Sequence, residues 1–250
     1  MPAALHRPAA ALVCVAVAVS ATACGPSPGG GPTRTEMLGR AIEATESATS
    51  VTVHTDGMSL MVPVKGRVSL DERGNCTATM SYGTAGTVDL ITIDGRDVYL
   101  RRDEPLLRTQ ERHRSPEDLK ALVAKVGGRW TRPAVGGPGA PAELTLCAGV
   151  NLPAGLENGW DDDSGKGEPA TVDGRKALKL VRRGGESETT VYIAAEGPPY
   201  LLKIVTKGGE SPGTTTYAHY GRAGGAEAPP PRALGVPRRA TPRGGRGPPA

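Results

Sequence analysis

Two internal cysteines, Cys76 and Cys147, are the first side chains in this sequence that suggest chemistry. A zinc site is not indicated, because neither has a second cysteine or a histidine at ligand spacing. In an oxidising compartment two such cysteines predict one disulfide. It would close a loop of about 70 residues and stabilise the fold by roughly 4 kcal/mol. The alternative is a pair of buried free thiols, since the sequence does not show that the two meet.

Catalytic groups follow no recognisable pattern. The chain has no Gly-x-Ser-x-Gly, His-Glu-x-x-His, Walker or Ser-x-x-Lys motif. His54, His113 and His219 have no partner at triad or ligand spacing, so we expect structural or surface roles for them. The acidic run 161–163 lacks the length and alternation of an EF-hand loop and is interpreted as a solvated loop. We therefore expect no enzyme activity, no metal and no cofactor.

The N-terminus predicts export and anchoring. Residues 1–23 have the layout of a signal peptide, with Arg7, an apolar run at 9–19 and small residues before Cys24. The apolar run is about half as long as a membrane span. The pattern resembles the lipobox of bacterial lipoproteins, with Ala21 where Leu is more usual. The resemblance implies a lipid on Cys24 and attachment to the extracytoplasmic face of the cell membrane; the alternative is a secreted protein cleaved nearby.

Composition divides the rest of the chain into a tether at 24–34, a domain at 35–220 and a tail at 221–250. The tail contains six of the arginines and one acidic residue, whereas 24–220 carries a net charge of −2. Because the tail is built mainly from Pro, Gly, Ala and Arg, it is predicted to be disordered. An exported chain of this kind has no nucleic-acid partner, although a weak contact of the tail with anionic lipid or wall polymer is an alternative to a purely solvated tail.

The domain alternates between helical and strand periodicities. Thr35 is the expected cap of a first helix, and a second helix is predicted after Ser115, with a stop at 127–128. A short helix is expected at 142–147. Trp130 and Trp160 are expected in the core or at a cavity mouth. The predicted strands, separated by turn residues, are 51–56, 58–70, 76–82, 87–93, 97–101, 169–172, 175–182, 188–195, 200–206 and 214–220.

Several phrases support a family resemblance, among them DGRDVYL, GGRWTRP, TVDGRKALKL and TTVYIAAEGPPYLLKIV. With this layout, residues 35–220 resemble actinobacterial lipoproteins of the LolA-like superfamily, which includes the lipid-carrying LppX and LprG family. The resemblance implies an α+β fold: a strongly bent antiparallel half-barrel of about ten strands, covered on its concave face by helices and enclosing an apolar cavity for acyl chains. The chain departs from the family in having no Phe and in its Gly- and Pro-rich middle.

We expect aliphatic side chains at alternating strand positions to line the acyl-chain cavity. For each of them a close-packed core position is the alternative, because alternation cannot separate the two. The candidates are Met58, Leu60, Val62, Val64, Val68, Met80, Leu178, Leu180, Val191, Ile193, Leu202 and Ile204.

The leading hypothesis is a membrane-anchored, monomeric protein whose partners are the membrane, through Cys24, and a lipid or acylated ligand. The second is a tethered binding or sensing module of the same fold with a filled core. An enzyme is a distant third.

Overall fold

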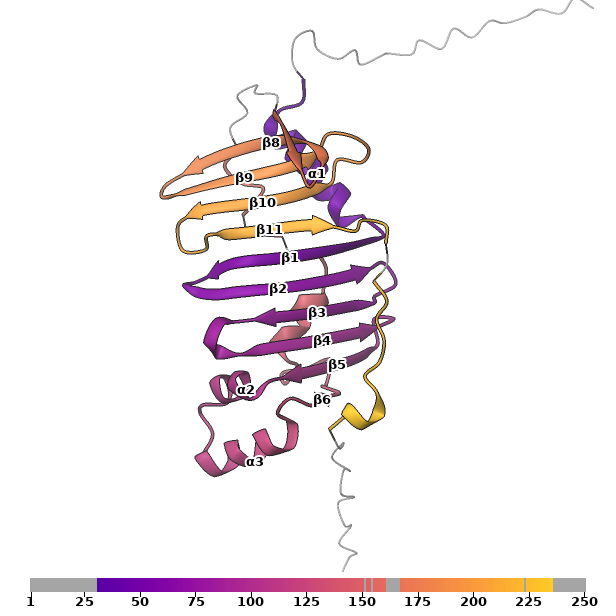
Figure 1. The fold of residues 1–250 in the computed structure, drawn as a ribbon, viewed down its shortest axis with the longest axis vertical. Coiled ribbons are helices and arrows are strands. Elements are labelled where there is room, and N and C mark those ends of the chain that lie inside the picture. The colour runs from indigo at the N-terminus through magenta and orange to yellow at the C-terminus, as the bar shows by residue number, and fades with distance from the viewer. Residues whose placement is uncertain (1–30, 151, 154, 161–166, 223, 236–250) are drawn as a thin grey trace, which may run out of the picture. The chain divides into compact units, whose positions relative to one another are not determined.

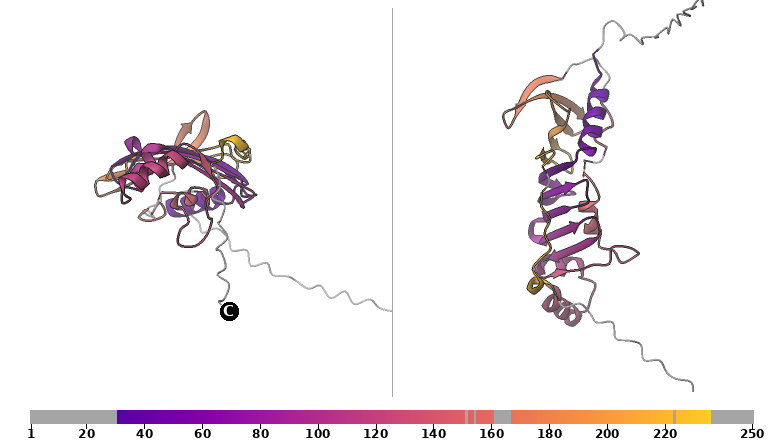
Figure 2. Two further views of the ribbon diagram at one scale, coloured as in Figure 1. Left: turned by 90° about the horizontal axis from the view of Figure 1, so that it is seen from below. Right: turned by 90° about the vertical axis from the view of Figure 1, so that its right-hand side faces the viewer.

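One antiparallel sheet of eleven strands organises the computed structural model, which describes residues 31–150, 152–153, 155–160, 167–222 and 224–235 (Figure 1). The predictions for the signal peptide, Cys24 and the run 161–163 lie outside the described residues. The predicted fold class is confirmed: the sheet is open, curved and accompanied by a few helices, with eleven strands in place of about ten (Figure 2). The strands are β1(Ser50–Ser59), β2(Val62–Asp71), β3(Cys76–Ser81), β4(Thr87–Ile93), β5(Asp97–Arg102), β6(Trp130–Thr131), β7(Glu168–Val172), β8(Arg175–Gly184), β9(Ser187–Ala194), β10(Leu201–Gly208) and β11(Gly213–Ala218).

The sheet joins two meanders through the first and last strands of the domain. Its order is β6-β5-β4-β3-β2-β1-β11-β10-β9-β8-β7, so every neighbouring pair except one is consecutive in the chain. The exception is the pairing of β1 with β11, which runs from Thr52 opposite Ala218 to Gly57 opposite Gly213.

The helices begin at side-chain caps. In α1(Arg34–Glu46) the cap is Thr33, which forms a capping box with Glu36, so the predicted cap was two residues late. As predicted, Ser115 caps α3(Pro116–Val126). The sequence analysis missed α2(Glu104–Gln110). Three short 3₁₀ helices complete the described elements: η1(Gly83–Ala85), η2(Ala142–Cys147) at the predicted place, and η3(Pro231–Ala233).

The predicted strand 58–70 is wrong, because the chain reverses at Leu60 and Met61. These two residues form a tight turn with φ of 47° and 68°, and Ser59 lies opposite Val62 at the end of the β1–β2 ladder. A two-residue turn shifts the alternation: odd positions of β1 and even positions of β2 face the same side. The break expected between the predicted strands 51–56 and 58–70 is also wrong, since β1 continues through Asp56 and Gly57.

Two separate covers lie on one face of the sheet (Figure 2). The helix α1 packs Leu38 and Ala41 onto β1 and β8 to β11, together with the buried Leu156 and Trp160. The helix η2 packs Leu144 and Leu146 onto β2 to β5. The core of this face therefore consists of two clusters, one beneath each cover.

The C-terminal segment 224–235 crosses the opposite face (Figure 2). Pro229 is buried, Leu234 pairs in parallel with Trp130, and Gly235 donates its N–H to the Trp130 carbonyl at 2.7 Å. The structure thus packs the first part of the predicted disordered tail against the sheet. The backbone pairing with Trp130 holds this part of the chain in place, and composition alone gave no sign of it.

Candidate functional site

A line of small and polar side chains along β1 leads from the core to the edge of the sheet. By alternation, Val53, Thr55, Gly57 and Ser59 all face the side that α1 and η2 cover. Two cavities open along this line, one at each end. Together they form the candidate site, which we call the β1 cleft.

The inner cavity is small and apolar. Its volume is about 70 Å³, and it lies between the sheet and Leu146 of η2. Apart from Thr55, every residue around it presents an apolar side chain, so the space has no group that would hold a water by several hydrogen bonds. It is lined by Val53, Thr55, Val68, Leu70, Met80 and Leu146.

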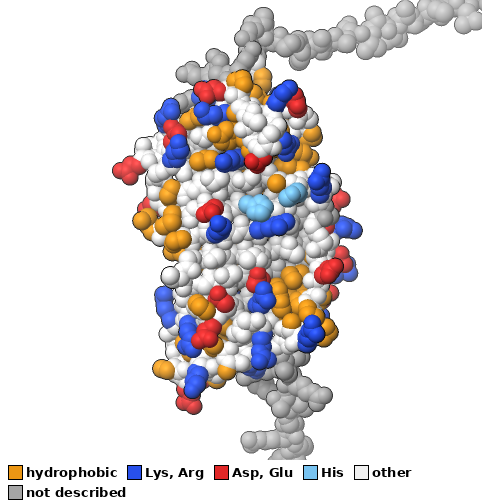
Figure 3. Space-filling model, viewed as in Figure 1, with side chains coloured by type: hydrophobic (Ala, Val, Ile, Leu, Met, Phe, Trp, Pro, Cys, Tyr) orange, Lys and Arg blue, Asp and Glu red, His pale blue; other side chains and the backbone are white. Residues whose placement is uncertain are grey.

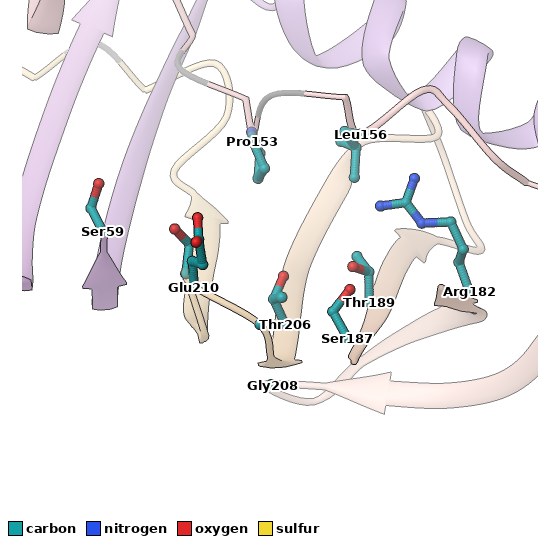
Figure 4. Close-up of a pocket in the computed structure, with 11 residues that line it drawn as sticks. Ser59, Pro153, Leu156, Arg182, Ser187, Thr189, Thr206, Gly208 and Glu210 are labelled. Carbon is teal, nitrogen blue, oxygen red and sulfur yellow. The ribbon is translucent and has the colours of Figure 1, made fainter. Parts of the chain in front are cut away.

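The outer cavity is larger, open and of mixed polarity. It has a volume of about 520 Å³ at the ends of β1, β9 and β10 (Figure 4). Hydroxyl groups dominate its wall, with Leu156 and Pro153 on the side of the cover. The lining residues are Ser59, Pro153, Leu156, Arg182, Ser187, Thr189, Thr206, Gly208, Gly209, Glu210 and Ser211.

Arg182 is fixed in this wall by the cover. Its guanidinium donates to the carbonyl oxygen of Gly155 at 3.1 Å and also to that of Asn158, and it lies 5.3 Å from the centre of the Trp160 ring. The indole N–H of Trp160 in turn donates to the Leu156 carbonyl. The cation therefore ties the 155–160 segment to β8 while remaining at the cavity.

Between the two cavities, β1 and β11 carry no side chain at the pair formed by Gly57 and Gly213. Gly57 lies opposite Gly213, and a Cβ added to Gly57 would stand 2.5 Å from the Gly213 Cα. Contacts below 3 Å are not tolerated, so glycine is required where the two strands approach each other. The same requirement leaves this position without a side chain on both strands, and Val64 of β2 lies beside Gly57.

A disulfide and a buried ion pair fasten η2 over the inner cavity. The predicted Cys76–Cys147 disulfide is present, with Cα atoms 5.8 Å apart. Glu143 accepts from Arg102 through both carboxylate oxygens, each at 2.8 Å, and from Gln110 at 2.9 Å. Burial by itself raises the pKa of Glu143, but these hydrogen bonds outweigh it and lower the pKa to about 2.

Eight of the twelve predicted cavity residues belong to the covered face. Val68 and Met80 line the inner cavity. Leu178 is half-buried and lies at a position of β8 that faces the cover. The others are close-packed members of the two core clusters, namely Val64, Leu180, Val191, Ile193 and Ile204.

The remaining four predicted positions lie elsewhere. Leu60 and Val62 are exposed at the β1–β2 turn, and Met58 falls on the opposite face, because the turn shifts the alternation. Leu202 packs with Ala177 on that opposite face, since the register changes between Leu201 and Lys203.

Sequence reasoning missed the cover residues Leu146 and Leu156, which come from a Gly- and Pro-rich stretch without periodicity. Trp160 is buried and Trp130 half-buried beneath Arg101. Among the described residues no group of three metal-ligating side chains occurs, and no described helix has the length and apolarity to span a membrane.

The comparisons with known proteins concern the fold. No protein-family model and no curated protein matches the chain. The Mycobacterium tuberculosis lipoprotein LppX is 14% identical with a TM-score of 0.42, covering 77% of this chain and 97% of its own. LprF from Mycobacterium bovis is 14% identical with a TM-score of 0.46, covering 78% and 96%. Both TM-scores are below 0.5, so the likeness assigns no function. LppX belongs to the lipoprotein family that the sequence of this chain resembles.

Proposed function

We propose that this protein is a membrane-anchored extracytoplasmic lipoprotein that binds an acyl chain of a lipid in the β1 cleft. The observation that carries the proposal is the polarity of the cleft, which is apolar at its inner end and gains hydroxyl and charged groups at its outer end. A lipid has the same division along its length. Apolar burial of the chain drives binding, and the hydroxyl groups with Arg182 orient the polar end.

Binding of an acyl chain requires the cleft to widen. A cavity of about 70 Å³ is smaller than the several hundred Å³ of ordinary ligand sites. Leu146 closes it from η2, whereas Val68 and Met80 belong to the sheet. Because η2 is fastened to the sheet at Cys147 and Glu143, the outer side of the cleft, beneath Pro153 and Leu156, is the side that opens for the chain.

The test uses the chain purified from a native-like host. Organic extraction followed by mass spectrometry is expected to recover an acyl lipid in stoichiometric amount, and a fluorescent fatty acid is expected to bind competitively with it. Val68→Phe fills the inner cavity and should abolish binding of the probe. The matched control, Ile91→Phe, adds the same ring on the opposite face and should leave binding unchanged. Absence of both extracted lipid and probe binding would refute the proposal, as would full binding by folded Val68→Phe.

A second function, a tethered binding or sensing module with a filled core, is favoured by the tight packing beneath α1. Leu180, Val191 and Leu201 are all 0% exposed. In that case the outer cavity and the surface would engage a partner without any acyl chain. The same extraction separates the two functions, because a filled-core module returns no stoichiometric lipid.

A further inference from the structure

The tip of the β1–β2 hairpin presents three apolar side chains to solvent. Leu60 is 73% exposed, Met61 71% and Val62 42%, and we call these three residues the apolar tip. Hydrophobic side chains gather at the left edge of Figure 3, over the ends of β1 and β2. Among the described residues only one other large hydrophobic side chain, Val135 in a different loop, is comparably exposed.

The residues of the tip are poorly suited to the turn they form. Leu60 and Met61 both have positive φ, a conformation that favours Gly, Asn and Asp. In the turns at Asp94 and Asp173, by contrast, the residues with positive φ are the preferred Asp and Gly. Neither folding nor solubility accounts for Leu and Met at the tip, whereas contact with an apolar phase would.

The surroundings of the tip are free of charge over a long stretch. No charged residue occurs from Gly57 to Val64, and the flanking Asp56 and Lys65 neutralise each other at 3.0 Å across the hairpin. This stretch spans four residues on each strand, about 13 Å. The interfacial depth reached by membrane-surface elements is about 5–10 Å.

The neighbouring β3–β4 loop extends the uncharged surface, whereas the loop on the other side carries a charge. Residues 81–87 contain no charged side chain, and Pro63 lies against Gly83. On the other side Met58 donates its N–H to the Pro212 carbonyl, in the loop that holds Glu210. The uncharged surface is therefore continuous on the β3 side of the tip.

A lipid surface fits the tip better than a protein does. The three side chains offer a few hundred Å² on a convex point, whereas a stable protein interface takes about 800 Å² from each partner. A bilayer needs no complementary shape. It does require paired backbone groups, and the ladder continues to Ser59 opposite Val62, so few peptide groups of the turn would need new partners.

We propose that the apolar tip inserts into the interfacial region of a lipid bilayer. The proposal rests on the membrane location in the proposed function, but not on acyl-chain binding in the β1 cleft. Insertion would hold the hairpin edge, and with it the outer cavity that Ser59 lines, against the membrane surface.

The experiment measures co-sedimentation of the full chain carrying Cys24→Ser, which cannot be lipidated at that position, with vesicles. One set of vesicles is phosphatidylcholine, and another is phosphatidylethanolamine with phosphatidylglycerol. Replacing the turn by Leu60→Asn with Met61→Gly should lower partitioning by roughly tenfold to a hundredfold. Because Asn-Gly is the preferred pair for this turn, the thermal midpoint should be unchanged or higher. The matched control Val135→Asn removes an exposed apolar side chain elsewhere and should leave partitioning unchanged.

Equal partitioning of the Asn-Gly variant and the unsubstituted tip, or no partitioning by either, would overturn the proposal. So would a dimer that the Asn-Gly substitutions dissociate, since the tip would then bind a second copy. Recovery of lipid from the cleft without any vesicle binding would defeat only this inference. Vesicle binding without any recovered lipid would defeat only the proposed acyl-chain site.

Discussion

Replacing Glu143 with glutamine tests whether the buried ion pair fastens η2 to the sheet. The Glu143 side chain is 7% exposed, and its carboxylate receives two hydrogen bonds from Arg102 and one from Gln110. Glutamine keeps the shape but loses the charge, and it turns one acceptor into a donor facing the guanidinium. Arg102 is then left partly buried without a charged partner.

The expected loss follows from the pKa of Glu143. A decrease from 4.5 to about 2 corresponds to roughly 3 kcal/mol of folding stability at neutral pH. That agrees with the roughly 3–5 kcal/mol observed when one partner of a buried pair is removed. Because the folded pKa lies below the unfolded one, this contribution is complete above about pH 5. It decreases as the pH falls towards 2, to about half at pH 3.

The assay is urea unfolding of the disulfide-bonded chain at pH 7, 5 and 3. Glu143→Gln should lower the free energy of unfolding by roughly 3 kcal/mol at pH 7, and the difference from the unsubstituted chain should shrink by about half at pH 3. The exposed Glu72→Gln serves as the control for loss of one carboxylate. A loss that is the same at pH 7 and pH 3, or below about 0.5 kcal/mol at pH 7, would refute this account of the pair.

Two further predictions concern the covers. Cys76→Ala with Cys147→Ala should lower the free energy of unfolding by about 2–4 kcal/mol, and equal urea midpoints with and without the bridge would contradict this. Thr45 in α1 accepts the Leu201 N–H at 2.9 Å and contacts the Tyr220 hydroxyl at 3.4 Å in a buried position. Thr45→Val should therefore cost about 1–3 kcal/mol in the same measurement, whereas an unchanged midpoint would show that the Leu201 N–H finds another acceptor.

Turn chemistry explains much of what was predictable in the fold. Asp94-Gly95 and Asp173-Gly174 carry the residues that positive φ prefers, so both hairpins were placed from the sequence. Leu60-Met61 gives no such signal, and the apolar alternation of β1 passes into that of β2 without a visible break. Because this two-residue turn was not predicted, Met58 was assigned to the wrong face of the sheet.

The candidate site was predictable only on its sheet side. Val68 and Met80 were found by alternation, whereas Leu146 and Leu156 come from the stretch that begins with η2 and ends at Trp160, which has no period to follow. The volume of the cleft depends on how closely the covers approach the sheet. That distance is set by contacts between residues far apart in the chain, such as Arg102 with Glu143.

The pairing of β1 with β11 has a consequence for the order of folding while the chain is being synthesised. Strands β1 to β6 can form a meander as soon as they emerge, but the open edge of β1 has no partner until the last strand arrives. The second meander, β7 to β11, depends in turn on α1, the first element of the domain in the sequence, to cover its apolar face. Neither half is therefore a finished unit, and a chain truncated before Gly213 would present an unpaired edge strand to its neighbours.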